Sequence, residues 1–258
     1  MSLPDTDVQV WGRVSRAKPQ AIPETQEVPA RTTRYGALVT ESIVPTKHVL
    51  SDEGSYFMAT NPTPGTAIAY GSAGTQASFS DTVPFMIIKN GDTSSAIGKR
   101  LYIDYLKLIQ IGGTAPATTT SVNAALKIDS KNRDPTAGTL TSTIPQNMNA
   151  DDATGSVSQI LVPAGAVATI PAASSAARLV GRALLKGGPT LLLDEYTIQF
   201  GGADHPPQGG YLTTVSSYVT RMGPLVIGPQ ENAVLYLWFP GGATNPFSFE
   251  FELGLWER

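Results

Sequence analysis

The chain has 258 residues, 41% of them hydrophobic, which is enough for one large domain or two small ones. Its formal net charge is −3 at pH 7, so the chain as a whole lacks the positive field that nucleic-acid binding requires. Cysteine is absent, which excludes disulfides, thiol catalysis and cysteine metal sites and fits folding in a reducing cytoplasm.

Charged residues make up only 15% of the chain, against about 25% in typical soluble domains. Glycine (25) and proline (20) are numerous, a composition that favours short strands, long loops and surfaces that neighbouring molecules cover. No apolar run approaches the length of a membrane span, and the N-terminus has no signal-peptide core. We therefore expect a soluble protein with no membrane partner.

Residues 1–35 are predicted to form an extended arm. Prolines recur there and apolar residues are sparse, which disfavours helices and regular strand pairing. Five positive and four negative side chains leave the arm nearly neutral. We expect it to contact a neighbouring subunit, with folding back onto its own domain as the alternative. The residues expected to make the contact are Val8, Val10, Trp11, Arg13 and Arg16.

From residue 36 onward, strand-like segments follow one another at short intervals, separated by Gly, Pro and Asn turns. The segments are Ala37–Val44, Ser55–Thr60, Phe85–Lys89, Arg100–Ile111, Val122–Ile128, Val157–Val162, Ala166–Ile170, Arg178–Leu185, Leu191–Phe200, Tyr211–Thr220, Leu225–Ile227, Ala233–Phe239 and Phe247–Trp256. Ser174–Lys186 is also compatible with a helix, but Gly181 and the following diglycine favour a strand.

Apolar and polar residues alternate clearly in the last segment, where one face carries Phe247, Phe249, Phe251, Leu253 and Leu255. A repeat of two predicts a strand with one face buried. The same period in Arg100–Ile111 predicts a shared face, with Lys107 as its exception. That face comprises Leu101, Ile103, Tyr105, Ile109 and Ile111.

These patterns predict an all-β fold: a jelly-roll-like antiparallel β-sandwich spanning residues 36–258, preceded by the extended arm. No repeat of fixed period is visible, which argues against a propeller or a β-helix.

Candidate chemical groups are few. The two histidines, His48 and His205, do not have the spacing of a metal-ligand pair. Asp204 beside His205 could form a small loop site, but a solvent-exposed loop histidine is the favoured interpretation. Glu250 and Glu252 share a strand face about 6.5–7 Å apart. A carboxylate pair can serve glycoside hydrolysis, but alternation with Phe favours a solvated or intersubunit face.

Two further arrangements could bind ligands. The loop around Asp151 and Asp152 offers oxygen ligands for calcium, although a loop without a metal is the favoured interpretation. A sugar-stacking platform could be built from Tyr196, Tyr211, Tyr218, Trp238 and Trp256, of which Trp238 is expected in the core. No nucleophile, base and orienting group can be assembled, so we expect no enzymatic activity, cofactor or metal.

Four blocks of the chain resemble a group of virion structural proteins from podovirus-like tailed bacteriophages. The blocks read HVLSDEGSYFMATNPTPGTAIAY from residue 48, ARLVGRALL from residue 177, GPQENAVLYLWFP from residue 228 and FEFELGLWER from residue 249. The resemblance covers most of the chain beyond residue 36 and consists of strand and turn motifs.

The resemblance implies a protein of the capsid shell, assembled in the host cytoplasm. Its implied role is that of a cement or decoration protein, a homotrimer that binds the outside of the major capsid protein lattice. A head-fibre or tail receptor-binding protein with glycan-binding loops is the alternative. A major capsid protein of the single jelly-roll type is a third possibility, which the near-neutral arm disfavours because neutralising a genome requires many basic residues.

Overall fold

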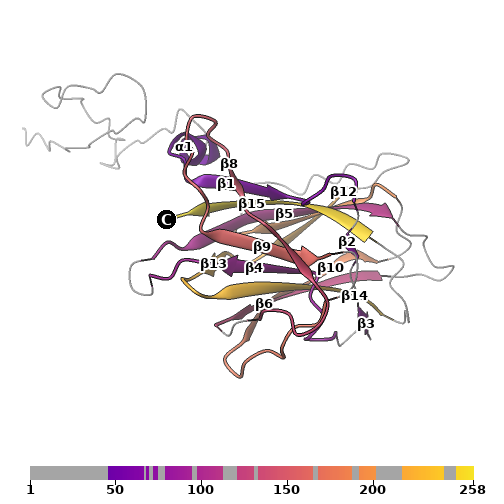
Figure 1. Ribbon diagram of the computed structural model, residues 1–258. Coiled ribbons are helices and arrows are strands. Elements are labelled where there is room, and N and C mark those ends of the chain that lie inside the picture. The colour runs from indigo at the N-terminus through magenta and orange to yellow at the C-terminus, as the bar shows by residue number, and fades with distance from the viewer. Residues whose placement is uncertain are drawn as a thin grey trace, which may run out of the picture.

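The computed structural model describes residues 46–66, 68–69, 72–74, 79–94, 98–112, 121–130, 133–164, 168–187, 192–201, 217–240 and 248–258. These residues form a sandwich of two β-sheets with one short helix at one end (Figure 1). The prediction of an all-β sandwich is confirmed, whereas the jelly-roll connectivity stays a prediction. The predicted arm, residues 1–35, and the predicted strand Ala37–Val44 lie outside the described residues.

The first sheet has the order β12-β11-β5-β15-β1-β8, with β13 paired to β5 and β2 paired to β15. Its pairings are antiparallel except for β11 with β12. Its strands are β1 (Tyr56–Thr60), β2 (Ile68–Ala69), β5 (Leu101–Gly112), β8 (Gln146–Asn147), β11 (Glu195–Phe200), β12 (Ser217–Met222), β13 (Leu225–Ile227) and β15 (Ser248–Glu257).

The second sheet has the order β10-β6-β14-β4-β9-β7, with β3 paired in parallel to β14. Its strands are β3 (Ser72–Gly74), β4 (Met86–Asn90), β6 (Ser121–Asp129), β7 (Leu140–Thr143), β9 (Ser158–Pro163), β10 (Arg178–Gly187) and β14 (Asn232–Pro240). The helix α1 (Thr46–Asp52) packs beside β1. The strand interpretation of Ser174–Lys186 is confirmed by β10.

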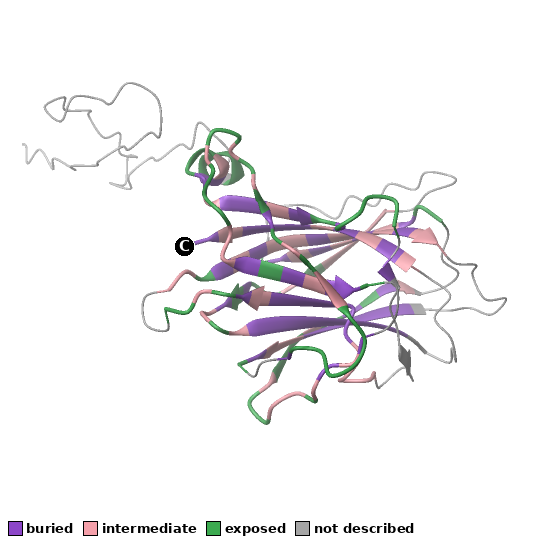
Figure 2. Cartoon of the chain, in the orientation of Figure 1, coloured by how far each residue is buried: buried purple, intermediate pink, exposed green. Residues whose placement is uncertain are grey.

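The main core lies between the sheets and follows the alternation that the last segment shows. Phe249, Phe251, Leu253 and Leu255 of β15 are buried, and Glu250 and Glu252 between them are partly exposed. Buried residues run along the strands of both sheets, whereas most exposed residues outside β10 lie in loops and on α1 (Figure 2). Each buried side chain of this size stabilises the fold by about 1.5–3 kcal/mol.

The predicted face of β5 is wrong beyond Ile103. Ile103 pairs with Leu255 and Tyr105 pairs with Gly254, so Asp104 is an extra residue in a β-bulge. The bulge reverses the alternation, and the buried residues after it are Leu106, Leu108 and Gln110. Tyr105, Ile109 and Ile111 therefore do not share the core face with Leu101 and Ile103. Lys107 is no exception, since it points outward and pairs with Glu195 at 3.3 Å.

A second, smaller cluster covers the outer face of the second sheet. It comprises Ile87, Ala125, Ile170, Val234, Tyr236 and Trp238. Beside it, the guanidinium of the fully buried Arg133 donates to Asp129 at 3.1 Å and to the Tyr236 hydroxyl at 3.0 Å. Its Nη2 also donates to the backbone oxygen of Asp81 at 2.7 Å. These bonds hold the segments after β6 and before β4 on this face.

Candidate interaction surface

The most unusual exposed residues lie on β10, the edge strand of the second sheet. Leu179 and Leu184 are each 55% exposed, and Val180 is 40% exposed. Ala183 and Leu185 of the same strand are buried and face the core. Two register shifts against β6, at Val180 and Leu185, change which residues of β10 point outward.

Arginines flank these apolar residues. Arg178 at the start of β10 and Arg182 in its middle are exposed. The Arg182 guanidinium lies 5.5 Å from the ring centroid of Trp238, a cation–π contact that holds it over the second sheet. The β10 strip, defined as Arg178, Leu179, Val180, Arg182 and Leu184, is thus an apolar strand surface edged by positive charge.

The core-facing side of β10 packs against β12 of the other sheet. A Cβ built at Gly181 would lie 2.5 Å from Met222 Sδ, and Lys186 Nζ lies 4.9 Å from the centroid of the Tyr218 ring. A larger residue at 181 would displace the Met222 side chain. Because β12 lies on the inner side of β10, a partner can reach the outward side chains of β10.

Two more exposed leucines lie in the turn that precedes β11. Leu192 and Leu193 are 56% and 55% exposed, and Leu193 has a left-handed backbone with φ of 67°. This conformation costs a leucine about 1–2 kcal/mol. The Leu193 amide is held by a 2.7 Å bond to the Gln110 carbonyl. A salt bridge of 2.7 Å from Lys186 to Asp194 ties the turn to the end of β10.

The outer face of the first sheet is polar. The Tyr105 hydroxyl donates to Glu252 at 2.5 Å, and the Tyr56 hydroxyl donates to Asp104 at 2.8 Å. Burial, with the nearby carboxylates Asp104 and Glu252, raises the pKa of both tyrosines well above the usual value. Both therefore stay neutral and act as donors across the physiological range.

The carboxylate pair of β15 lies on this same polar face. Glu252 accepts from Tyr105, and Glu250 accepts a hydrogen bond from the Gly65 amide. Both are partly exposed, as the solvated-face interpretation predicts.

The five aromatic residues suggested as a sugar platform do not gather on one surface. Tyr196 and Trp238 are fully buried, the latter in agreement with its expected place in the core. Tyr218 stacks on Tyr196, and Tyr211 lies outside the described residues. Trp256 instead stacks on Tyr102, with the ring planes 1° apart and the centroids at 5.5 Å. The sequence gives no direct signal for this pair, because the β5 bulge sets its register.

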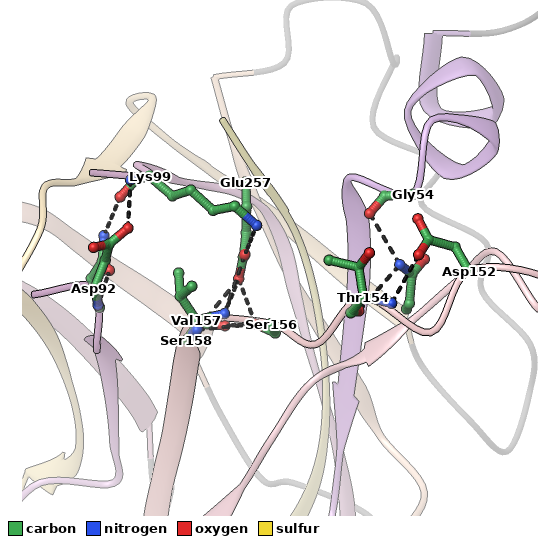
Figure 3. A network of polar contacts seen from close by, with 11 residues as sticks. Gly54, Asp92, Lys99, Asp152, Thr154, Ser156, Val157, Ser158 and Glu257 are labelled. Atoms are coloured by element: carbon green, nitrogen blue, oxygen red, sulfur yellow. Dashed lines mark hydrogen bonds and ion pairs between the residues drawn. The ribbon is translucent and has the colours of Figure 1, made fainter. Parts of the chain in front are cut away.

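Carboxylates organise the loops at the end of the sandwich that carries α1 (Figure 3). Asp92 accepts from the amides of Ser94 and Lys99, both at 2.8 Å, and Asp152 accepts from the Thr154 amide at 2.8 Å. Hydrogen bonds of this kind lower the pKa of both aspartates.

The buried carboxylate of Glu257 lies in the same region (Figure 3). It accepts from the Val157 amide at 3.1 Å and from Ser156, and it faces Lys99 at 3.6 Å. These bonds fix the loop before β9 against the last strand.

The remaining candidate ligand groups are the two histidines and the Asp151–Asp152 loop. Within the described ranges, no group of three or more His, Asp or Glu side chains could hold a metal ion, and the Asp151–Asp152 loop belongs to no such group. His48 is exposed on α1, and His205 lies outside the described part of the chain. The same holds for the predicted contact residues Val8, Val10, Trp11, Arg13 and Arg16. No helix in the described segments is long and apolar enough to cross a membrane.

Comparisons with known proteins give no relative: no family model, no curated protein and no solved structure matches the chain.

Proposed function

We propose that the chain is a structural protein of a phage virion that binds the outer face of the major capsid lattice and stabilises the shell. The observation that carries this proposal is the β10 strip, in which apolar side chains that would ordinarily be buried are held outward on a rigid sandwich. Burial against a partner of a leucine that is now exposed is worth up to about 1.5–3 kcal/mol. The strip supports assembly with other chains, either neighbouring copies or shell subunits, and the resemblance of four sequence blocks to phage virion proteins supports the capsid lattice as the place of that assembly.

Shell stabilisation requires many weak contacts rather than one strong site. A homotrimer that touches several capsid subunits at once converts modest contacts into slowly released binding. In this proposal the arm, residues 1–35, contributes contacts between subunits or with the shell, with Val8, Val10 and Trp11 as apolar anchors and Arg13 and Arg16 beside them. Prolines in the arm reduce the entropy that it loses on binding. The protein acts by adhesion, without catalysis, at the capsid surface.

Binding to capsids tests the proposal. Purified chain is mixed with empty expanded capsids of the phage that encodes it, and the bound fraction and the heat tolerance of the capsids are measured. We expect saturable binding in hundreds of copies per particle and a higher temperature of capsid rupture, because the copies tile the lattice. A chain lacking residues 1–35 is expected to bind less. Absence of the chain from capsids at saturating concentration would overturn the proposal.

A second candidate is a head-fibre or receptor-binding protein, favoured by the stacked pair of Tyr102 and Trp256. Both rings are partly exposed, and Trp256 borders the acidic face of β15. Aromatic faces bind the apolar side of sugar rings, and carboxylates accept hydrogen bonds from their hydroxyls. Glycan-array binding by the full chain that is lost in Trp256→Ala would support this role. Capsid association without glycan binding would exclude it.

A further inference from the structure

The sandwich presents two different edges. β12 ends the first sheet on one side, and β10 packs against it there. β1 and β8 end the same sheet on the other side, and α1 packs beside β1 (Figure 1). The helix α1, which begins at Thr46, therefore lies at the edge opposite to the β10 strip. At about 4.8 Å per strand, the first sheet separates β12 from β1 by roughly 19 Å.

A segment of the chain itself has the chemistry that complements the β10 strip. The strip offers Leu179 and Leu184 beside Arg178 and Arg182. Residues 5–11 read DTDVQVW, in which two aspartates are followed by two valines and a tryptophan. The apolar residues of the segment can pack against the leucines of the strip while its aspartates lie near the arginines of the strip, so the two are complementary in both polarity and charge. Such a segment can lie across the outward face of β10, on the side opposite to β12.

The linking chain is long enough to reach a neighbour. Residues 12–45 number 34, counted from the numbering of the sequence, and span up to about 110 Å when extended. The segment that binds is joined to one edge of the domain, and the strip that it binds belongs to the opposite edge. Identical copies can therefore join head to tail, with the segment of each copy bound to the strip of the next. Such contacts close into a ring when the rotation between copies allows it.

We propose that residues 5–11 of one copy bind along the β10 strip of a second copy, in a head-to-tail contact that repeats around a closed oligomer. The inference deepens the proposed function. It rests on that proposal only for the expectation that copies of the chain associate with one another. It assigns the predicted arm contact of Val8, Val10 and Trp11 to Leu179 and Leu184 of the neighbouring copy.

Because the chain has no cysteine, a single engineered pair reports this contact directly. Full-length Val10→Cys is mixed with full-length Leu184→Cys, the oligomers are allowed to exchange subunits, and the thiols are then oxidised. Disulfide-linked dimers are identified by mass. The matched control replaces Leu184→Cys by Val226→Cys, which places the thiol at another exposed apolar position, on β13 of the first sheet. We expect mixed dimers at least about tenfold above the control, since bound segments raise the local thiol concentration.

Two further measurements complete the test. The oligomer mass of Leu184→Glu, measured by light scattering, is expected to fall to that of the monomer, while Val226→Glu keeps the oligomer. Disulfides that close only within one chain in the double variant Val10→Cys/Leu184→Cys would overturn the proposal, as would mixed dimers no more abundant than in the control. None of these readouts uses capsids. A linked oligomer that does not bind capsids therefore contradicts the proposed function alone, and capsid binding without linkage contradicts this inference alone.

Discussion

Tyr105 and Gly254 lie opposite each other across β5 and β15, directly after the bulge at Asp104. A Cβ at Gly254 would lie 2.5 Å from Tyr105 Cε1 and closer still to the Tyr56 hydroxyl. Glycine at this position lets both tyrosine rings lie over the strand. Their hydroxyls then reach Glu252 and Asp104.

Gly254→Ala is expected to lower the free energy of unfolding by about 1–3 kcal/mol, because both rings must move and their hydrogen bonds lengthen. Urea unfolding of the purified chain measures this change. Gly155→Ala is the matched control, since no atom lies within 4 Å of a Cβ built there, and a change within about 0.5 kcal/mol is expected. Equal midpoints for the two variants would show that the rings accommodate a methyl group.

The same bulge explains how far the sequence could predict the fold. The alternation in β15 runs through Phe249, Phe251, Leu253 and Leu255 on one buried face, and a period of two was enough to predict it. In β5 the period changes at Asp104 because the strand carries one residue more than its partner there. Such a mismatch belongs to the pair of strands and leaves no mark in either sequence alone.

The candidate surface was less predictable for a similar reason. The strand β10 was predicted correctly, but its outward residues depend on register shifts at Val180 and Leu185. Whether Leu184 is buried or exposed is decided by what packs over it, which a single sequence does not state. Glu257, at the end of the chain, reads as an exposed charge and is buried because the loop before β9 surrounds it.

Glu257→Gln is expected to destabilise the sandwich by about 1.5–3 kcal/mol, since a buried carboxylate that accepts several hydrogen bonds loses its charge and one acceptor oxygen. Its bonds from Ser156 and Val157 hold the loop that leads into β9. Thermal and urea unfolding measure the loss. Glu53→Gln is the control, because Glu53 pairs with Arg258 in an exposed salt bridge of 3.6 Å, and a loss below about 1 kcal/mol is expected. Equal losses in the two variants would contradict a special role for Glu257.

Asp81 gives the fold a dependence on acid pH. Burial alone would raise its pKa, but hydrogen bonds from Lys127 at 2.6 Å and from the Ala173 amide at 2.7 Å lower its pKa below the ordinary aspartate value of 3.8. A folded-state pKa below the unfolded one means that the unfolded chain binds the proton more readily. This contribution to stability is therefore complete above pH 3.8 and is lost as the pH falls through the lower folded value.

Asp81→Asn is expected to be less stable at neutral pH and to lose less stability on acidification than the unmodified chain. The measurement is the urea midpoint at a series of pH values from neutral to strongly acidic. Asp151→Asn removes an exposed carboxylate of the same type and serves as the control. Parallel curves for Asp81→Asn and the unmodified chain would show that Asp81 does not contribute to the acid transition.

The side chain of Gln110 is fully buried on the core face of β5, and neither its Nε2 nor its Oε1 has a hydrogen-bond partner in the structure as described. A buried amide without partners costs about 1–3 kcal/mol of stability. Gln110→Met keeps the length of the side chain and removes both polar atoms, so it is expected to raise the free energy of unfolding by a similar amount. Gln199→Met, on the partly exposed face of β11, is expected to change it by less than about 0.5 kcal/mol. A destabilised Gln110→Met would mean that the amide is satisfied by an internal water molecule, which the apolar side chain then displaces at a cost.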